Sequence, residues 1–154
     1  MTPAVNAAKA AGVAYHVHEY THDPKAHSYG LEAAEKLGLD PARVMKTLVV
    51  ETDTRELVVA VLPVASMLNL KAMAKAIGAK KVALADVRLV ERTTGYVVGG
   101  VSPLGQRKRL RTAVDASAAT YPTVYVSGGR RGLDLELAPA DLIALTAATV
   151  AALC

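Results

Sequence analysis

The sequence contains no phenylalanine and no tryptophan, and Cys154 is its only cysteine. A hydrophobic core must therefore be built from aliphatic side chains, and any ring that contacts a ligand comes from one of six tyrosines or four histidines. A single cysteine excludes a disulfide within the chain, and such cysteine usage is typical of a reducing cytosol. We expect a cytoplasmic protein.

Long apolar segments are also missing. The longest apolar runs, such as residues 58–64, have the length of a strand and are too short to span a bilayer. The first residues reach Lys9 without the apolar stretch of a signal peptide, so we expect no association with a membrane. With 52% hydrophobic and 21% charged residues among 154, the composition is that of a globular protein, and we expect one domain over residues 1–154. The formal charge of +4 suits an anionic ligand without requiring one.

Short helical and strand patterns alternate along the chain. Capping residues and stopping glycines predict helices over residues 3–12, 29–37, 69–77 and 86–94, and Pro139 opens a last helix that we expect to reach the C-terminus. Strands are expected over residues 13–20, 46–51, 57–62, 81–84, 95–98, 110–114, 123–126 and 133–137. The polar turn 52–55 predicts a hairpin between the second and third of these strands. The pattern predicts an α/β (α+β) domain with a mixed, strongly curled, barrel-like central sheet flanked by helices.

Two glycine-rich segments are candidate ligand loops. The first, residues 95–106, contains four glycines and a proline, and exposed N–H groups in such a loop can bind phosphate or carboxylate oxygens. It differs from a P-loop, because Gln106 and Arg107 occupy the positions of the required Lys and Ser/Thr, and Ser102 does not stand in a G-x-S-x-G motif. The second, residues 127–132, combines three glycines with two arginines and precedes Asp134. Either segment can equally be a turn without a ligand.

Lys46 and Thr47 stand at the start of an apolar strand. A lysine in that position can extend its ammonium group to solvent, which is the usual outcome. It can also project into a pocket, where desolvation would lower its pKa below the ordinary ~10.4. The strand pattern alone favours the first alternative.

The four histidines lie between positions 16 and 27. His16 and His18 are two apart on an expected strand and so share one face, while His22 and His27 fall in a polar loop together with Asp23. A zinc site is conceivable, but no cysteine supports it and the loop has no defined geometry. A partly exposed sheet face beside a polar loop is the better interpretation, and we expect no metal.

Cations are concentrated in two parts of the sequence. Residues 106–111 contain four of them, and Lys71, Lys75, Lys80 and Lys81 form a second group. Such density can follow a phosphate backbone. It is also common on solvated surfaces, and without interleaved aromatic residues the pattern leaves both alternatives open.

The chain as a whole resembles the YbaK-type proteins. The matching motifs are, in order, M-T-P-A at 1–4, H-D-P at 22–24, M-K-T-L-V-V at 45–50, M-L-N-L-K at 67–71, T-G-Y-V-V-G-G-V-S-P-L-G-Q-R-K at 94–108 and Y-V-S-G-G-R-R-G-L-D-L-E-L-A-P-A-D-L at 125–142. These proteins belong to the superfamily that includes the editing domain inserted in bacterial prolyl-tRNA synthetases. The similarity covers nearly the whole chain, and the two glycine-rich motifs are quite specific in this order and spacing.

The resemblance implies trans-editing: removal of the wrong amino acid from a mischarged tRNA, chiefly cysteine from tRNA(Pro), with Cys-tRNA(Cys) as a further substrate. It implies no cofactor and suggests prolyl-tRNA synthetase as a partner. Lys46 is the residue on which the family depends most, as the anchor of the terminal adenosine and of the aminoacyl ester. The other positions that match the family's pocket are Tyr20, Tyr29, Thr47, Gly99, Ser127 and Asp134; position 29 is often Phe in relatives.

The residues offer no convincing nucleophile for ester hydrolysis, since no Ser-His pair is evident. Lys46 and the amides of Gly99 and Gly100 can supply positioning and stabilise an oxyanion. In the family, the proposed mechanism is attack by the thiol of the substrate's own cysteine on its ester carbonyl, which gives free tRNA and a thiolactone.

Two alternatives stay open. A deacylase of the same superfamily could clear alanine or another small residue, because such pockets discriminate single methylene groups by only ~1–3 kcal/mol. The chain could instead be a non-catalytic module that binds tRNA or a synthetase. In either case we expect the basic segment, with Arg107, Lys108 and Arg109, to receive the acceptor end of the tRNA.

Overall fold

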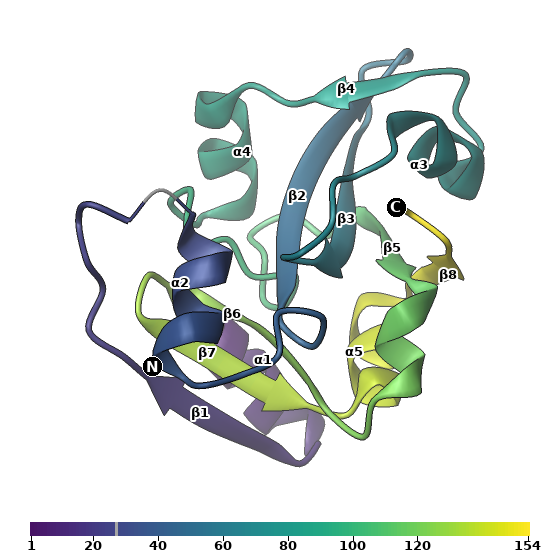
Figure 1. The fold of residues 1–154 in the computed structure, drawn as a ribbon. Helices are drawn as coiled ribbons and strands as arrows, with labels where there is room; N and C mark the ends of the chain where they lie inside the picture. The colour runs from purple at the N-terminus through teal and green to yellow at the C-terminus, as the bar shows by residue number, and fades with distance from the viewer. Residues whose placement is uncertain (27) are drawn as a thin grey trace.

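The computed structural model describes residues 1–26 and 28–154 (Figure 1). No described helix is long and apolar enough to cross a membrane. The helices are α1 (Pro3–Ala11), α2 (Tyr29–Lys36), α3 (Leu70–Ile77), α4 (Val87–Thr94) and α5 (Pro139–Thr146), with a 3-10 helix at Ala116–Thr120. The strands are β1 (Tyr15–Glu19), β2 (Met45–Thr52), β3 (Leu57–Pro63), β4 (Val82–Leu84), β5 (Arg111–Asp115), β6 (Val124–Arg130), β7 (Leu133–Leu137) and β8 (Thr149–Ala151).

The expected capping residues begin the helices. The side chain of Thr2 accepts a hydrogen bond from the Val5 amide, with Pro3 as the first helical residue. Asn69 caps α3 in the same way through the Ala72 amide. These side chains satisfy amides that have no partner within a helix. The predicted starts of α1 and α3 are confirmed.

A five-stranded sheet has the order β4-β2-β3-β5-β8. The predicted hairpin is confirmed: β2 and β3 pair antiparallel, with Lys46 opposite Leu62 and Glu51 opposite Leu57. On the far side, β5 runs parallel to β3, and β8 runs parallel to β5. The sheet is therefore mixed, as expected.

A second, three-stranded antiparallel sheet has the order β1-β7-β6. It meets the first sheet at an isolated parallel bridge between Val44 and Tyr125. The expectation of one strongly curled, barrel-like sheet is wrong, because neither sheet is closed or strongly curled. The strands divide into two open sheets because β6 pairs along its length with β7 and, among the described residues, meets the first sheet only at this one bridge. The apolar faces of the two sheets then pack against each other.

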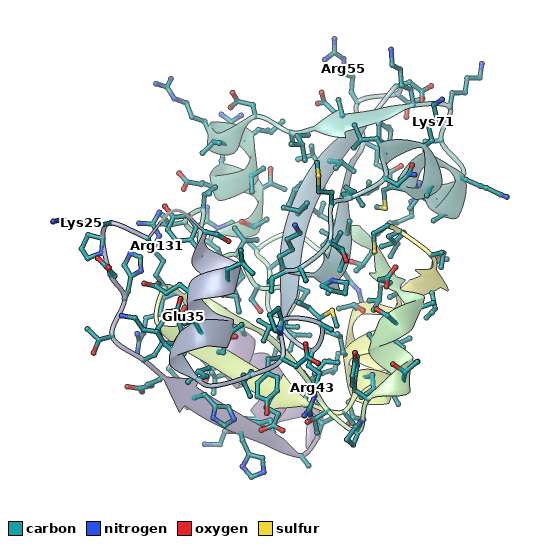
Figure 2. All side chains as sticks on the ribbon, in the orientation of Figure 1. Lys25, Glu35, Arg43, Arg55, Lys71 and Arg131 are labelled. Carbon is teal, nitrogen blue, oxygen red and sulfur yellow. The ribbon has the colours of Figure 1, made fainter. Side chains whose placement is uncertain are left out.

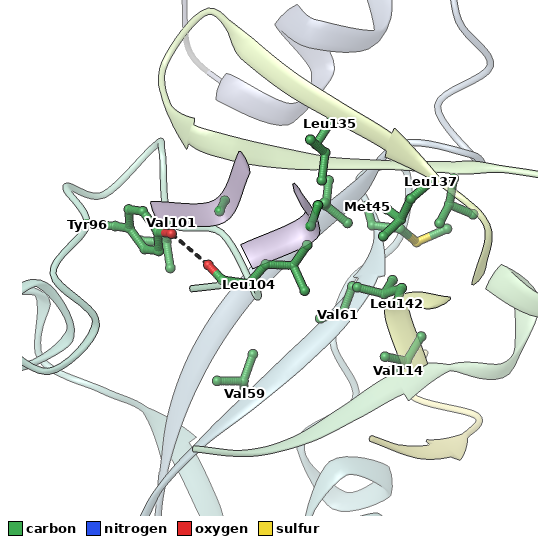
Figure 3. Close-up of a cluster of buried hydrophobic side chains, with 14 of the residues drawn as sticks. Met45, Val59, Val61, Tyr96, Val101, Leu104, Val114, Leu135, Leu137 and Leu142 are labelled. Atoms are coloured by element: carbon green, nitrogen blue, oxygen red, sulfur yellow. Dashed lines mark hydrogen bonds between the residues drawn. The ribbon is translucent and has the colours of Figure 1, made fainter. Parts of the chain in front are cut away.

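The main core fills the space between the two sheets (Figure 3). Leu135 and Leu137 of β7 face Val59 and Val61 of β3 across it, and α1 covers the same face of the small sheet with Ala4, Val5 and Ala8. The opposite face of the five-stranded sheet packs on α3. The opposite face of the small sheet packs on α2, which lies in front of β6 and β7 in Figure 1.

Two predicted elements are wrong. Residues 95–98 form bends and a turn in place of a strand, because Gly95 ends α4 in the left-handed conformation. The last helix stops at Thr146, where Ala147 adopts φ 51°, and the chain then adds β8 to the edge of β5. The Leu153 side chain beyond it is fully buried in the cluster under α3.

Tyr96→Phe tests a polar contact within the core. The Tyr96 hydroxyl donates a hydrogen bond of 2.6 Å to the buried carbonyl of Leu104 (Figure 3). Removing it leaves that carbonyl without its donor, so the free energy of unfolding should fall by about 1–2 kcal/mol. Urea denaturation measures this loss, and the dependence of the unfolding free energy on urea concentration should not change. Tyr15→Phe, at a half-buried ring, is the control. Equal loss in both variants would contradict a specific role for the Tyr96 bond.

Candidate functional site

The main cavity, of about 440 Å³, runs along one edge of β2. Its walls come from α2, from α4 and the turn after it, and from Ser127 of β6 and Asp134 of β7. The structure brings together seven of the predicted site residues on this cavity: Tyr20, Tyr29, Lys46, Thr47, Gly99, Ser127 and Asp134. Gly100, the eighth, lines a smaller neighbouring cavity.

The cavity exists because β2 is only partly paired on this edge. The short strand β4 pairs with Val50–Thr52, and the bridge to β6 lies at Val44. Ala85 donates to the Val49 carbonyl and Tyr125 to the Arg43 carbonyl on this side. Since backbone groups of alternate residues point to the same edge, those of Met45 and Thr47 point this way. The parallel bridge at Val44 uses the Met45 N–H, so the Met45 carbonyl and both backbone groups of Thr47 face the cavity.

Lys46 and Thr47 leave the strand on opposite faces of the sheet, as consecutive strand residues do. The Lys46 ammonium donates a hydrogen bond of 2.5 Å to the carbonyl of Ser66. Burial lowers the pKa of Lys46, and the nearby Cys154 thiol opposes the shift. The strand pattern favoured a lysine that extends to solvent, but in the structure the Lys46 side chain is partly buried and bonded to a backbone carbonyl.

The Thr47 hydroxyl lies on the other side of the strand. Its oxygen is buried, and no described residue forms a hydrogen bond with it. An unpaired buried hydroxyl costs free energy, typically about 1–3 kcal/mol. A polar ligand group in the adjoining cavity would remove that cost.

The polar end of the cavity is built from the small sheet. Ser127 of β6 and Asp134 of β7 are directly paired in the ladder and so share a face. Asp134 is 6% exposed, and burial raises its pKa to about 7, against the influence of His18. Burial and the charge of Asp134 also raise the pKa of the Tyr20 hydroxyl. This end therefore presents a carboxyl group that can change its charge near neutral pH.

The aromatic wall is formed by Tyr29 at the start of α2. The guanidinium of Arg131 lies 4.4 Å from the centre of its ring and donates a hydrogen bond of 2.7 Å to the Val98 carbonyl. Gly99, at φ 95°, lies so close that a Cβ would fall 2.5 Å from Arg131 Nε and 2.9 Å from the Tyr29 ring. Any side chain at this position would displace the wall.

Sequence reasoning missed Glu32, a carboxylate that is 6% exposed on the inner face of α2. It accepts hydrogen bonds of 2.7 Å from the His22 ring and from the Asp23 amide. Burial alone would raise its pKa, but these bonds and the charges of His22 and Lys36 outweigh burial and lower it. Glu32 thus ties the H-D-P motif to the helix that carries Tyr29. The H-D-P motif was the signal in the sequence that could have indicated Glu32, because the His22 ring and the Asp23 amide both need a hydrogen-bond acceptor.

The remaining histidines do not converge. His18 forms a contact of 2.8 Å with Glu136 on the polar face of the small sheet, and His16 is exposed. His27 lies outside the described residues. Among residues 1–26 and 28–154, no three His, Cys, Asp or Glu side chains are grouped as metal ligands.

The basic segment diverges in space. Arg107 lies against Gly95 beside the smaller cavity, and Lys108 is exposed next to it. Arg109 reaches the Leu145 carbonyl at 3.4 Å, and Arg111 forms two bonds of 2.8 Å with Glu56. The second lysine group lies elsewhere: Lys71 is far from Arg131 in Figure 2.

The cavity can position a ligand but offers no obvious nucleophile of its own. Its described lining has aliphatic hydroxyl groups from Ser28, Thr47 and Ser127 and phenolic ones from Tyr20 and Tyr29, and no described histidine or cysteine accompanies them. The Ser127 oxygen accepts a hydrogen bond from the Gly129 amide. Fold and site together define a small α/β protein with a cavity that could hold a compact ligand and position it for reaction.

Comparison with known proteins identifies the family. The model of the aminoacyl-tRNA editing domain matches residues 23–145. EbsC of Enterococcus faecalis, named as a proposed Cys-tRNA(Pro)/Cys-tRNA(Cys) deacylase, is 43% identical over 113 residues, which are 73% of this chain and 69% of EbsC.

Solved structures agree. A crystal structure described as a proposed trans-editing enzyme for prolyl-tRNA synthetase matches with a TM-score of 0.86 and 26% identity over 98% of this chain and 94% of that one. The crystal structure of hypothetical protein APE2540 matches with a TM-score of 0.87 and 30% identity over 98% of both chains. This chain belongs to the aminoacyl-tRNA editing domain family and acts on aminoacyl-tRNA. The resemblance seen in its motifs is confirmed.

Asp134→Asn should change how stability depends on pH. The pKa of Asp134 in the folded protein is about 7, whereas an unfolded aspartate titrates near ~3.9. The folded protein therefore holds this proton more tightly, so the contribution of Asp134 to stability falls as pH rises from ~4 to ~7. The amide has no charge to desolvate, so the stability of the variant relative to the wild type should rise by on the order of 3 kcal/mol over this range.

Urea denaturation at a series of pH values measures this difference, with Asp40→Asn at an exposed site as the control. Parallel stability curves for the wild type and Asp134→Asn would contradict a carboxyl group whose pKa is raised by burial.

Proposed function

We propose that this chain removes cysteine from mischarged Cys-tRNA(Pro) in trans, as a free-standing deacylase. The name given to EbsC and the trans-editing description of the structural relative support this substrate. The observation that carries the proposal is the grouping of Lys46, Thr47, Ser127 and Asp134 around one cavity. Its volume of about 440 Å³ is within the roughly 300–1,000 Å³ of small-molecule sites, so it suits the terminal aminoacyl-adenosine and not a larger part of the tRNA.

The two ends of the cavity differ in chemistry, and this sets the orientation of the ligand. Asp134, Ser127 and Tyr20 give one end polar groups, and Leu84, Ala85 and Val87 give the other an apolar lining. We place the aminoacyl group at the polar end, where the Thr47 hydroxyl and the β2 backbone can bind its ammonium group and ester. The adenine ring then lies at the apolar end, with Lys46 anchoring the adenosine between the two.

The reaction proposed is intramolecular. The thiol sulfur of the substrate cysteine attacks its own carbonyl carbon and the bond to the ribose oxygen breaks. The thiol proton leaves, the ribose oxygen is protonated, and water later opens the thiolactone. Holding sulfur and carbonyl in contact is the main task of the protein, and oriented groups of this kind contribute several kcal/mol.

Asp134 suits the proton transfer in this scheme. A general base works best when its pKa is near the operating pH, and that of Asp134 is raised to about 7. Backbone amides on the open edge of β2 and in the Gly99 turn can stabilise the oxyanion. The described lining residues leave the nucleophile to the substrate, consistent with this route.

Selection of tRNA(Pro) is proposed to depend on prolyl-tRNA synthetase as a partner that delivers the tRNA. The cavity itself is too small to contact more than the acceptor end. The exposed cations Arg107 and Lys108, beside the smaller cavity, are proposed as contacts to that end, together with Arg109.

Deacylation assays with a panel of substrates test the proposal. Wild-type protein should release cysteine from Cys-tRNA(Pro) and leave Ser-tRNA intact, because a serine hydroxyl is a much weaker nucleophile than a thiol. Lys46→Ala should lose at least ~10-fold in rate, because without this anchor the adenosine no longer positions the ester, and a misplacement of about 1 Å can cost about 10²-fold. Lys71→Ala, an exposed lysine on α3, is the control.

Undiminished release by Lys46→Ala would contradict the anchoring role of Lys46. Cleavage of Ser-tRNA as fast as Cys-tRNA(Pro) would rule out the thiol-dependent step. Faster release from Ala-tRNA(Pro) would assign this chain to the alanine-specific members of the superfamily.

A further inference from the structure

A second, smaller cavity of about 240 Å³ lies next to the main one. The turn after α4 separates them: Gly99 lines the main cavity and Gly100 lines the second. Three glycines and two arginines contribute most of its lining. The lining residues are Gly95, Tyr96, Val97, Gly100, Gly129, Arg130 and Arg131. The proposed aminoacyl pocket and this cavity are therefore direct neighbours.

Three cations from two segments of the chain lie at or beside the second cavity. Arg130 and Arg131 come from the β6–β7 hairpin and are exposed. Arg107 comes from the basic segment: a Cβ added to Gly95, on the cavity wall, would lie 3.6 Å from Arg107 Nε and 3.8 Å from its terminal nitrogen. Arg107 is far from Arg130 and Arg131 in the sequence, and the fold brings it to the Gly95 wall of the cavity that these two residues line.

Two acidic groups lie near this cluster, and neither neutralises it. Glu19 is 3.8 Å from Arg130, and both side chains are more than half exposed, so the pair is weak. Glu91 accepts a hydrogen bond of 2.8 Å from the Val98 amide, so its carboxylate is bonded to the turn after α4 and not to an arginine. The cavity keeps a net positive rim.

The floor of the cavity is backbone because the segments approach too closely for side chains. A Cβ on Gly100 would lie 2.6 Å from the Arg130 Cα, and one on Gly129 would lie 2.9 Å from the Thr2 Cβ. A narrow hollow with a backbone floor and guanidinium groups on its rim suits a phosphate group, to which arginine donates paired hydrogen bonds.

We propose that this cavity binds the phosphodiester that links the terminal adenosine of the tRNA to the preceding nucleotide. The inference rests on the proposed function. If the terminal nucleoside of the tRNA fills the main cavity, the preceding nucleotides must leave that cavity over one of its walls. Arg131 joins the two sites: its guanidinium stacks on Tyr29, donates to the Val98 carbonyl and lines the second cavity. Phosphate binding there would hold the wall of the aminoacyl pocket in place.

Two substrates distinguish this subsite from the pocket itself. Cys-tRNA(Pro) carries the phosphodiester, and 3′-cysteinyl-adenosine carries none. For Arg107→Ala with Arg130→Ala, the KM for Cys-tRNA(Pro) should rise about tenfold, and the slope of log KM against log salt should fall by ~0.7 for each phosphate that the variant no longer neutralises. Turnover of cysteinyl-adenosine should stay within about twofold of the wild type. Inorganic phosphate should compete weakly with the tRNA in the wild type and not in the double variant.

Arg55→Ala is the matched control, because Arg55 is an exposed arginine in the turn between β2 and β3, distant from Arg131 (Figure 2). Thermal melting of every variant verifies folding. An unchanged KM and salt slope on Cys-tRNA(Pro), with an active wild type, would overturn the subsite. Equal losses on both substrates would also overturn it, by assigning the arginines to the shape of the main pocket. A wild type that cleaves neither substrate would instead refute the proposed function.

Discussion

The unpaired edge of β2 between Val44 and Val49 is the constraint on which the site depends. A strand edge in the interior of a fold leaves backbone N–H and C=O groups without partners, which is costly unless something covers them. Here β4 covers the edge only from Val50 onward, and β6 touches it at Val44. The gap between them is the main cavity. A ligand that pairs with the Met45 carbonyl and with the backbone groups of Thr47 would complete the edge, so the same gap that weakens the sheet creates the binding site.

The small sheet supplies the polar half of the site through strict alternation. Leu133, Leu135 and Leu137 point into the core, so Asp134 and Glu136 point to the other face, under α2. Glu136 finds His18 and Thr123 as partners, and its pKa is lowered because these bonds outweigh burial. For Asp134 burial prevails and its pKa rises. Two carboxyl groups on one strand thus acquire different proton affinities from their surroundings, which is the pattern of a functional site.

Local elements of the fold could be predicted from the sequence because their signals are local: the Thr2 and Asn69 caps, and the hairpin around residues 52–55. The division into two sheets could not, because it depends on which apolar faces meet across the core. β8 was missed because Ala147 leaves the helix without a glycine or proline to mark the end. The residues around the main cavity could be named only through the order of the family motifs. The contact of Lys46 with the Ser66 carbonyl, the role of Glu32 and the approach of Arg107 to Gly95 needed the three-dimensional structure.

The central claim is that the open edge of β2 holds the aminoacyl end of the tRNA. The most direct measurement is NMR titration of the isotope-labelled protein with a stable analogue, 3′-cysteinylamido-adenosine, in which an amide replaces the ester. We predict the largest amide shifts at Thr47 and Gly99, saturating together with those of Ser127 and Asp134. Saturable binding that leaves the β2 edge unshifted, with changes confined to another surface, would contradict the claim.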